Sequence, residues 1–224
     1  VREAAYGLSD IENQVPFTAD TVCWIASVTK PVTTAALMKL VEEGKLRLDD
    51  PVEKHLPEFQ AQKDKQGRRH AITIRQLLTH TSGLPGDPPT RKDVFDAGWR
   101  GKSVAQTVGP IASAGLLFAP GSKVQYSNTA FYVVGRIIEI ASGRPYADYV
   151  KEKILDPLGM TKSFYPRFLA SVPPARMASV YRQRKGERFL YFRYEPNMVT
   201  RNDTPDGGLF CTARDLHRFC QMFL

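Results

Sequence analysis

The 224-residue sequence lacks several patterns that would define its class at once. No apolar run approaches the roughly 18 residues that span a bilayer. The chain begins at Val1 without a charged and then apolar leader, so no signal peptide is expected in it. Glycine and proline, at 16 residues each, are scattered, which excludes a collagen-like or low-complexity chain. The remaining composition, with 42% hydrophobic and 24% charged residues, is typical of a folded protein.

Cysteine and histidine are too few and too dispersed to indicate a metal site. The three cysteines, Cys23, Cys211 and Cys220, form no C-x-x-C pair, and their odd number argues against a complete disulfide framework. The H-E-x-x-H pattern is missing, and the four histidines lie far apart in the sequence. We therefore expect reduced cysteines, no metal and no other cofactor.

The charge balance is basic, because 31 Lys and Arg residues exceed 23 Asp and Glu residues and give a net charge of +8. Such an excess suits nucleic acid or an anionic membrane surface. The basic residues are nevertheless spread along the chain, with short clusters at 63–69 and 182–193 that resemble no recognition helix or stacking motif. We interpret the charge as a solvated surface and expect no nucleic-acid partner. A basic nucleic-acid-binding protein stays as a remote alternative.

Helix signals dominate the chain up to about residue 175. Capping residues such as Ser27, Thr73 and Ser103 precede helix-compatible stretches, and Gly44 and Gly143 follow two of them. The predicted helices cover 28–43, 73–78, 103–114, 129–142 and 146–155. The helix at 129–142 is apolar on most faces, so we expect it to be buried.

Strand signals return after about residue 175. Two alternating, aromatic-rich stretches at 178–184 and 188–194 flank Lys185-Gly186-Glu187 and predict a hairpin, and Thr212 caps a final helix. The predicted order along the chain is strands, then helices, then strands again. This order predicts an α+β fold with an antiparallel sheet, flanking helices and a helical insertion. We expect a single domain over 1–224. Its sheet-associated layer takes 1–45 and 160–224, and its mostly helical region takes 46–159.

The first candidate for chemistry is Ser27-Val28-Thr29-Lys30. If Ser27 opens a helix, the Lys30 amine lies one turn further on the same face. A serine hydroxyl becomes a nucleophile when a base takes its proton, and burial in apolar surroundings lowers the pKa of a lysine enough for that role. The motif alone is weak, since about 0.6 matches to S-x-x-K arise by chance in this composition. A helix-capping serine followed by a surface lysine is the alternative.

The second candidate is Tyr126-Ser127-Asn128, a pattern with about 0.16 chance matches. It lies in a loop just before the predicted buried helix, where a rigid neighbour can aim side chains at a cleft. A phenol there can pass a proton between a nucleophile and a leaving group, and an amide can orient a carbonyl substrate. An Asn cap with a tyrosine packed beneath it explains the pattern equally well.

Together these residues resemble the serine β-lactamase-like family, the group of class C β-lactamases, DD-carboxypeptidases and esterases related to penicillin-binding proteins. The resemblance covers almost the whole chain and implies a β-lactamase/transpeptidase-like fold. Matches in family order and at family-like spacing carry it, at 25–31, 77–84, 120–121, 126–128, 157–160, 207–209 and 212–216.

The resemblance implies a role for each candidate residue. Ser27 is expected to be the acylated nucleophile, and Lys30 its proton acceptor or the partner that keeps Tyr126 deprotonable. Tyr126 is expected to act as general base and acid, and Asn128 to bind the substrate amide or carbonyl. Lysine and tyrosine share a coupled proton in such a site, so naming one base is a choice of model. We expect His80 to be structural, because no G-x-S-x-G accompanies it.

The chain departs from the family in its third motif, a Lys-Thr-Gly, His-Thr-Gly or His-x-Gly on a later strand. Lys185-Gly186 lies in a predicted turn, and the sequence ends soon after Gly207-Gly208. We therefore expect an internal fragment of a longer protein, truncated at both ends and weakly active or inactive by itself. A non-catalytic binding or scaffold member of the same fold is the alternative to an enzyme.

The resemblance implies a serine hydrolase that cleaves an ester, amide or β-lactam bond through an acyl-enzyme. A β-lactamase, a D-Ala-D-Ala carboxypeptidase and an esterase all fit this description. The expected partner is a small-molecule or peptide-like substrate with an acyl group. A periplasmic or extracellular location is implied, while the physiological substrate and the oligomeric state are not.

Overall fold

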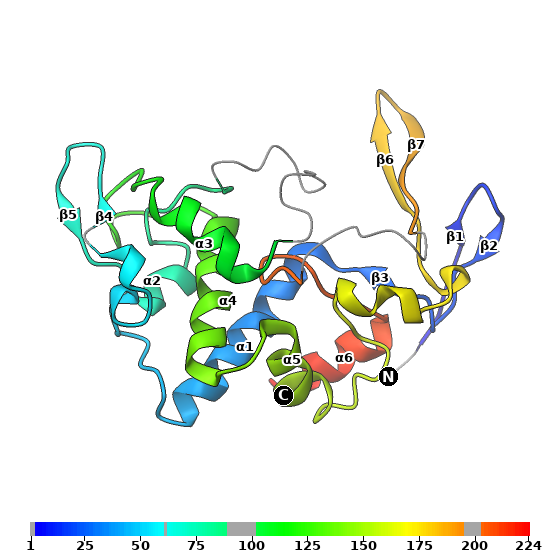
Figure 1. Cartoon of the computed structure of the whole chain (residues 1–224). Coiled ribbons are helices and arrows are strands. Elements are labelled where there is room, and N and C mark those ends of the chain that lie inside the picture. Colours follow the sequence, from blue (N-terminus) through cyan, green and yellow to red (C-terminus); the bar gives the residue numbers. More distant parts are fainter. Residues whose placement is uncertain (1–2, 61, 89–101, 195–202) are drawn as a thin grey trace.

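The computed structural model describes residues 3–60, 62–88, 102–194 and 203–224. Its helices pack together in the centre of the molecule, and short β ribbons project at opposite ends (Figure 1). The ribbon of β4 and β5 lies at one end, and the ribbons β1–β2 and β6–β7 lie at the other. The described residues therefore form an α+β fold, as the sequence predicts.

The helices begin and end close to their predicted limits. The α-helices are α1 (Thr29–Glu42), α2 (Ile74–Leu78), α3 (Val104–Ala112), α4 (Asn128–Ser142), α5 (Tyr146–Val150) and α6 (Ala213–Gln221). Helix α5 continues into the π-helical segment η5 (Lys151–Leu155). Short 3₁₀ segments are η1 (Ala26–Val28), η2 (Val52–Lys54), η3 (Pro57–Phe59), η6 (Pro166–Ser171) and η7 (Pro174–Arg176).

Side-chain caps fix where these helices start. Thr73 and Ser103 each accept a backbone N–H bond from the residue three positions later and form complete capping boxes on α2 and α3. Ser127 caps α4 by accepting a hydrogen bond from the N–H of Ala130. The cap of α4 is therefore Ser127 and not Asn128, which leaves the Asn128 side chain free to serve the site.

The strands pair two by two within the described residues. The antiparallel pairs are β1 (Leu8–Asp10) with β2 (Val15–Pro16), β3 (Cys23–Trp24) with β8 (Phe210–Cys211), β4 (Gln62–Lys63) with β5 (Arg69–His70), and β6 (Val180–Arg184) with β7 (Glu187–Phe192). The predicted hairpin is confirmed at β6–β7. Lys185 and Gly186 form its turn with φ values of 52° and 85°, the positive values that a tight two-residue hairpin needs.

The main hydrophobic core unites segments from the whole length of the chain. Helix α1 packs on α4, with Leu37, Leu40, Val133 and Ile137 fully buried between the elements. The same cluster includes Leu209, which follows the Gly207-Gly208 pair. The apolar run of α1 that the sequence analysis singled out thus forms the wall behind the candidate nucleophile. A smaller cluster joins Val22, Met177, Tyr194 and Phe210.

The pairing of β3 with β8 brings the first and last parts of the chain together beside α1. Cys23 lies opposite Cys211, and all three cysteines are free thiols in the structure. Burial raises the pKa of Cys211 to about 12 and also raises the pKa of Cys23. Both thiols therefore stay protonated and unreactive at neutral pH.

Candidate active site

Ser27 lies at the exposed start of a helical segment, because η1 runs directly into α1. The chain makes a sharp turn just before it, where Ala26 has a φ of 47°, an uncommon value for a residue with a side chain. Trp24 supports this turn by donating a hydrogen bond from its indole N–H to the carbonyl of Gly207. The turn places the Ser27 hydroxyl at the surface while the rest of α1 is packed.

Lys30 is buried, with 5% of its surface exposed, in the first turn of α1. Its Nζ donates hydrogen bonds to Ser27 Oγ at 3.1 Å, to Asn128 Oδ1 at 2.8 Å and to the carbonyl oxygen of Asp206 at 2.7 Å. An ammonium group has three N–H donors, and each of them has an acceptor here. The S-x-x-K spacing therefore does bring the amine to the hydroxyl, and the alternative of a surface lysine is wrong.

The loop that carries the Asp206 carbonyl is held against α1 and α4 by buried contacts. Thr33 Oγ1 donates to the carbonyl of Pro205 at 2.7 Å and lies 2.6 Å from the Tyr146 hydroxyl. Pro205 packs against Gly135 of α4 so closely that a Cβ there would lie 2.1 Å from its ring. A glycine in α4 thus lets the loop approach near enough for its next residue to bind Lys30.

Tyr126 reaches the same place from the loop before α4. The Lys30 Nζ lies 4.8 Å from the centre of the Tyr126 ring, and the His80 ring lies 4.6 Å from it. The tyrosine is 51% exposed, and within the described part of the chain its hydroxyl makes no hydrogen bond. The structure therefore brings the Tyr126 ring beside Lys30, while the hydroxyl that would move a proton has no hydrogen bond to the group around Lys30 in the described residues.

His80 supports this loop. Its Nδ1 accepts a hydrogen bond from the N–H of Ser127 at 3.1 Å, and its carbonyl accepts one from the N–H of Gln125 at 2.9 Å. Burial and the nearby Lys30 charge both lower the pKa of His80, so the neutral imidazole that this acceptor role requires is favoured. These contacts fit the expected structural role of His80.

Asp87 is a site residue that the sequence analysis missed. Asn128 donates from Nδ2 to Asp87 Oδ1 at 2.8 Å while its Oδ1 accepts from Lys30. The two bonds fix which end of the amide faces the lysine. Asp87 lies in the exposed loop that follows the 77–84 run, where Gly86 accepts the backbone N–H bond of Asn128 at 2.6 Å. The turn signal Pro85-Gly86-Asp87-Pro88 marked this loop, but nothing in it indicated the partner.

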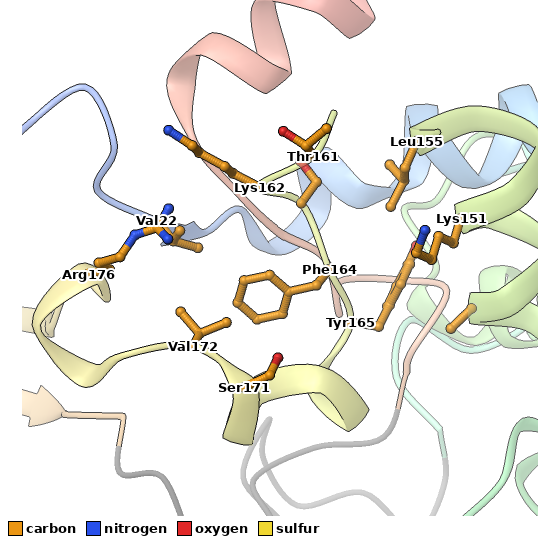
Figure 2. Close-up of a pocket in the computed structure, with 12 residues that line it drawn as sticks. Val22, Lys151, Leu155, Thr161, Lys162, Phe164, Tyr165, Ser171, Val172 and Arg176 are labelled. Atoms are coloured by element: carbon orange, nitrogen blue, oxygen red, sulfur yellow. The ribbon is translucent and has the colours of Figure 1, made fainter. Parts of the chain in front are cut away.

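A separate cavity of about 330 Å³ lies away from these residues (Figure 2). Its wall is apolar at Val22, Phe164 and Val172, and Lys151 and Arg176 stand at its margin. None of the four predicted site residues lines it. The candidate active site is therefore defined by the hydrogen bonds around Lys30 and not by this cavity.

Metal and membrane features were searched over the described ranges alone. Among those residues, no three His, Cys, Asp or Glu side chains come together in a way that would hold a metal ion. In the same ranges, no helix has both the length and the apolar character needed to cross a membrane.

Known proteins resemble this chain in sequence and in structure. Esterase EstB of Burkholderia gladioli is 39% identical over 185 residues, which cover 79% of this chain and 46% of that protein. The structure of EstCE1, described as a hydrolase with promiscuous acyltransferase activity, matches with a TM-score of 0.81 and 26% identity over 95% of this chain and 61% of the other. The D-amino acid amidase of Ochrobactrum anthropi SV3 matches with a TM-score of 0.74 and 26% identity over 95% and 58% of the two chains.

The matches differ in how much of each protein they cover. The chain spans about half the length of the curated relatives it matches, from 42% to 57%. The model of the Beta-lactamase family, in contrast, matches residues 1–224. The chain therefore belongs to the Beta-lactamase family.

Proposed function

We propose that the protein is a serine hydrolase that forms a covalent acyl-enzyme on Ser27 and cleaves an ester, amide or β-lactam bond. The observation that carries the proposal is the buried Lys30 amine, which donates at once to Ser27 Oγ, to Asn128 Oδ1 and to the Asp206 carbonyl. A surface lysine has no need of three acceptors, two of which come from segments 98 and 176 positions away in the sequence. This arrangement holds one cation against one exposed hydroxyl, as nucleophilic catalysis requires.

In the proposed reaction, Ser27 Oγ attacks the substrate carbonyl carbon and gives its proton to the Lys30–Tyr126 pair. The pair begins this step with one proton fewer than an ammonium and a neutral phenol carry together, so it has room for the serine proton. The backbone N–H of Ser27, at the start of the η1–α1 segment, donates to the oxyanion that forms. The bond to the leaving group then breaks, and the pair returns the proton to the leaving oxygen or nitrogen. Water hydrolyses the resulting ester in a second addition and releases the acid and the free hydroxyl.

We assign the proton that Ser27 loses to the Lys30–Tyr126 pair and not to one of the two residues. Lys30 has an acceptor for each N–H of its charged form, which favours an ammonium that attracts negative charge at Ser27 Oγ. Tyr126 lies beside that charge with an exposed hydroxyl, open to the leaving group of a bound substrate.

The substrate is proposed as a class of acyl donor. Similar proteins are named as an esterase and an amidase, which supports ester and amide bonds as targets. Asn128 keeps one N–H on Nδ2 after donating to Asp87, and we assign that N–H to the substrate carbonyl or amide oxygen. The resemblance to penicillin-binding proteins supports a location outside the cytoplasm, which fractionation of the source cells would test.

A burst experiment tests the proposal without requiring efficient turnover. The longer protein that we expect to contain these 224 residues is mixed with p-nitrophenyl butyrate, and the first phase of nitrophenolate release is measured. We expect about one equivalent per chain before a slow steady state, because acylation and deacylation are separate steps. Ser27→Ala should abolish the burst, and Ser113→Ala, at an exposed serine that ends α3, should keep it. A burst that survives in Ser27→Ala would contradict the proposal.

A further inference from the structure

The end of the β6–β7 ribbon is strongly basic. Residues 182–189, which we call the hairpin tip, contain four basic side chains against one acid, Glu187. The basic residues are Arg182, Arg184, Lys185 and Arg188, and all four are exposed. Within the described residues, none of these four side chains is in an ion pair. The hairpin tip therefore presents an uncompensated positive charge to solvent.

The base of the same ribbon is held in a different way. Arg193, just after β7, pairs with Asp10 at 2.7 Å and with Glu12 at 3.0 Å. The Tyr181 hydroxyl donates to Glu12 at 2.6 Å and accepts from the N–H of Ile11 at 2.7 Å. These contacts anchor the base of the ribbon, while its turn extends away from the helices (Figure 1). The ribbon thus carries its unpaired cations at a projecting end.

Aromatic side chains share one face of the ribbon with two of the cations. Arg182 lies opposite Phe189 in the strand register and Arg184 lies opposite Glu187, so these side chains are on one face. Phe189 is 45% exposed. Tyr191, two residues further along β7, is on the same face, and its ring centre lies 3.5 Å from the guanidinium carbon of Arg182. This face combines positive charge with exposed aromatic surface.

We propose that the hairpin tip docks on the surface of an anionic phospholipid bilayer. Negative lipid headgroups attract basic side chains, and an aromatic ring is favourable at the boundary between headgroups and acyl chains. A strand rises about 3.3 Å per residue, so the four cations lie within roughly 10 Å of the turn. That distance is close to the Debye length at about 0.1 M salt, so the cations act on one surface together.

The ribbon at the opposite end of the molecule provides a comparison. The turn between β4 and β5 is also basic, with Lys65, Arg68 and Arg69, but no Phe, Tyr or Trp occurs between 62 and 70. Arg68 is paired there with Asp64 at 2.8 Å. A soluble polyanion such as RNA would use the charges of either ribbon and offers no apolar phase for Phe189. The exposed ring beside unpaired cations therefore favours a bilayer as the partner of the hairpin tip.

The expected effects are large enough to measure. A basic residue near an anionic membrane surface contributes about fivefold to affinity, so the loss of two should weaken binding by about 10–30-fold. Phe189 should contribute about 3–10-fold, because just under half of its surface is available for transfer from water. Added salt should weaken the binding, since it shortens the range of the attraction.

The test measures co-sedimentation of the longer protein that we expect to contain these 224 residues with phospholipid vesicles. Vesicles that contain phosphatidylglycerol are compared with vesicles of phosphatidylcholine alone at about 0.1 M salt. We expect at least about tenfold stronger binding to the anionic vesicles. Arg184→Gln with Arg188→Gln should lose about 10–30-fold of that affinity, and Phe189→Ser about 3–10-fold. All three side chains are exposed, so circular dichroism should show an unchanged fold.

A matched control removes the same charge from the other ribbon. Lys65→Gln with Arg69→Gln changes two exposed cations near the β4–β5 turn and should weaken vesicle binding by less than about threefold. Equal losses in the two double variants would show attraction by net charge alone and would overturn the proposal. Binding without a preference for anionic vesicles, or binding that Phe189→Ser leaves unchanged, would also overturn it.

A uridine oligonucleotide serves as the polyanion probe. If the protein bound this RNA more tightly than the vesicles, and Phe189→Ser left the RNA binding unchanged, the hairpin tip would be a nucleic-acid surface and the proposal would be wrong. The inference does not depend on the proposed function, because vesicle binding is measured without any reaction at Ser27.

Discussion

The two halves of the candidate site are held in different ways. Lys30 is 5% exposed and is fixed by helix packing and three hydrogen bonds, whereas Tyr126 is 51% exposed and is fixed by ring contacts with Lys30 and His80. The Lys30 Nζ is nevertheless 4.8 Å from the centre of the Tyr126 ring. The helix-held half is part of the core, and the loop-held half lies on its surface. Changes in the first should therefore affect both stability and chemistry, and changes in the second should affect chemistry alone.

The largest expected effect is that of Lys30→Ala. It removes the cation from Ser27 and leaves the acceptor oxygens of Asn128 and Asp206 without their donor. We expect acylation to slow by about 10²–10⁴-fold, as when a general base is lost. The free energy of unfolding should fall by about 1–3 kcal/mol for the unsatisfied polar groups. Burst rates and urea denaturation check both values.

A matched control for Lys30→Ala lies on the same helix. Lys39→Ala removes an exposed lysine that pairs with Glu42 and should change neither the burst nor, beyond about 0.5 kcal/mol, the stability. If a folded Lys30→Ala chain were acylated at the normal rate, the account would be wrong, because the role of Lys30 would then be structural only.

The second effect concerns Tyr126→Phe, which removes the hydroxyl and keeps the ring contacts with Lys30 and His80. We expect the burst to slow by about 10–100-fold, near the lower end of a lost proton-transfer group. The free energy of unfolding should stay within about 0.5 kcal/mol, because the hydroxyl makes no hydrogen bond in the described residues. Stopped-flow release of nitrophenolate measures the rate. A large loss of stability with an unchanged acylation rate would contradict the account, because Tyr126 would then be needed for the fold and not for the chemistry.

The third effect concerns Thr33, which anchors the loop that contacts the helix-held half of the site. Thr33→Val removes a buried hydroxyl that contacts Tyr146 and the Pro205 carbonyl, at a cost of about 1–3 kcal/mol. The loop that presents the Asp206 carbonyl to Lys30 loses one anchor, so the burst should also slow several-fold. Thr34→Val, one residue later, removes a hydroxyl that donates to a carbonyl of its own helix and should cost less. Equal urea midpoints for the two variants would contradict this account.

The smallest effect is a pH dependence of stability through His80. Its pKa is lowered in the folded protein, so below the ordinary value of 6.5 the unfolded chain binds the proton first. Stability should therefore be complete above about pH 6.5 and fall as the pH decreases towards the folded pKa. His80→Gln keeps an acceptor for the Ser127 N–H and should flatten this decline. Urea titrations between pH 7.5 and 5 would show an equal slope in both proteins if His80 played no part.

Local sequence signals were enough to predict the helix-held half. Helix α1 begins two residues after Ser27 and ends two residues after its last buried leucine, close to the limits that the apolar run, Pro31 and Gly44 predict. The one-turn spacing from Ser27 to Lys30 is a property of the helix and needs no tertiary information. The capping residues of α2, α3 and α6 were predictable for the same reason.

The rest of the site depends on contacts between segments far apart in sequence. Lys30 binds Asn128 across 98 positions and the Asp206 carbonyl across 176 positions, and a backbone carbonyl has no side-chain signature. The bond between Asn128 and Asp87 was missed because the Gly-Asp-Pro sequence is typical of an ordinary loop. The lack of a hydrogen bond to the Tyr126 hydroxyl within the described residues was also unforeseen, since the motif predicts the position of the residue and not its rotamer.

The most direct test of the account locates the acyl group. The longer protein that we expect to contain this chain is treated with p-nitrophenyl butyrate and quenched in acid, and its peptides are analysed by mass spectrometry. We predict one butyryl group per chain, on the peptide that contains Ser27, and no such group in Ser27→Ala. A butyryl group on any other residue, or equal uptake by Ser27→Ala, would contradict the assignment of Ser27 as the nucleophile.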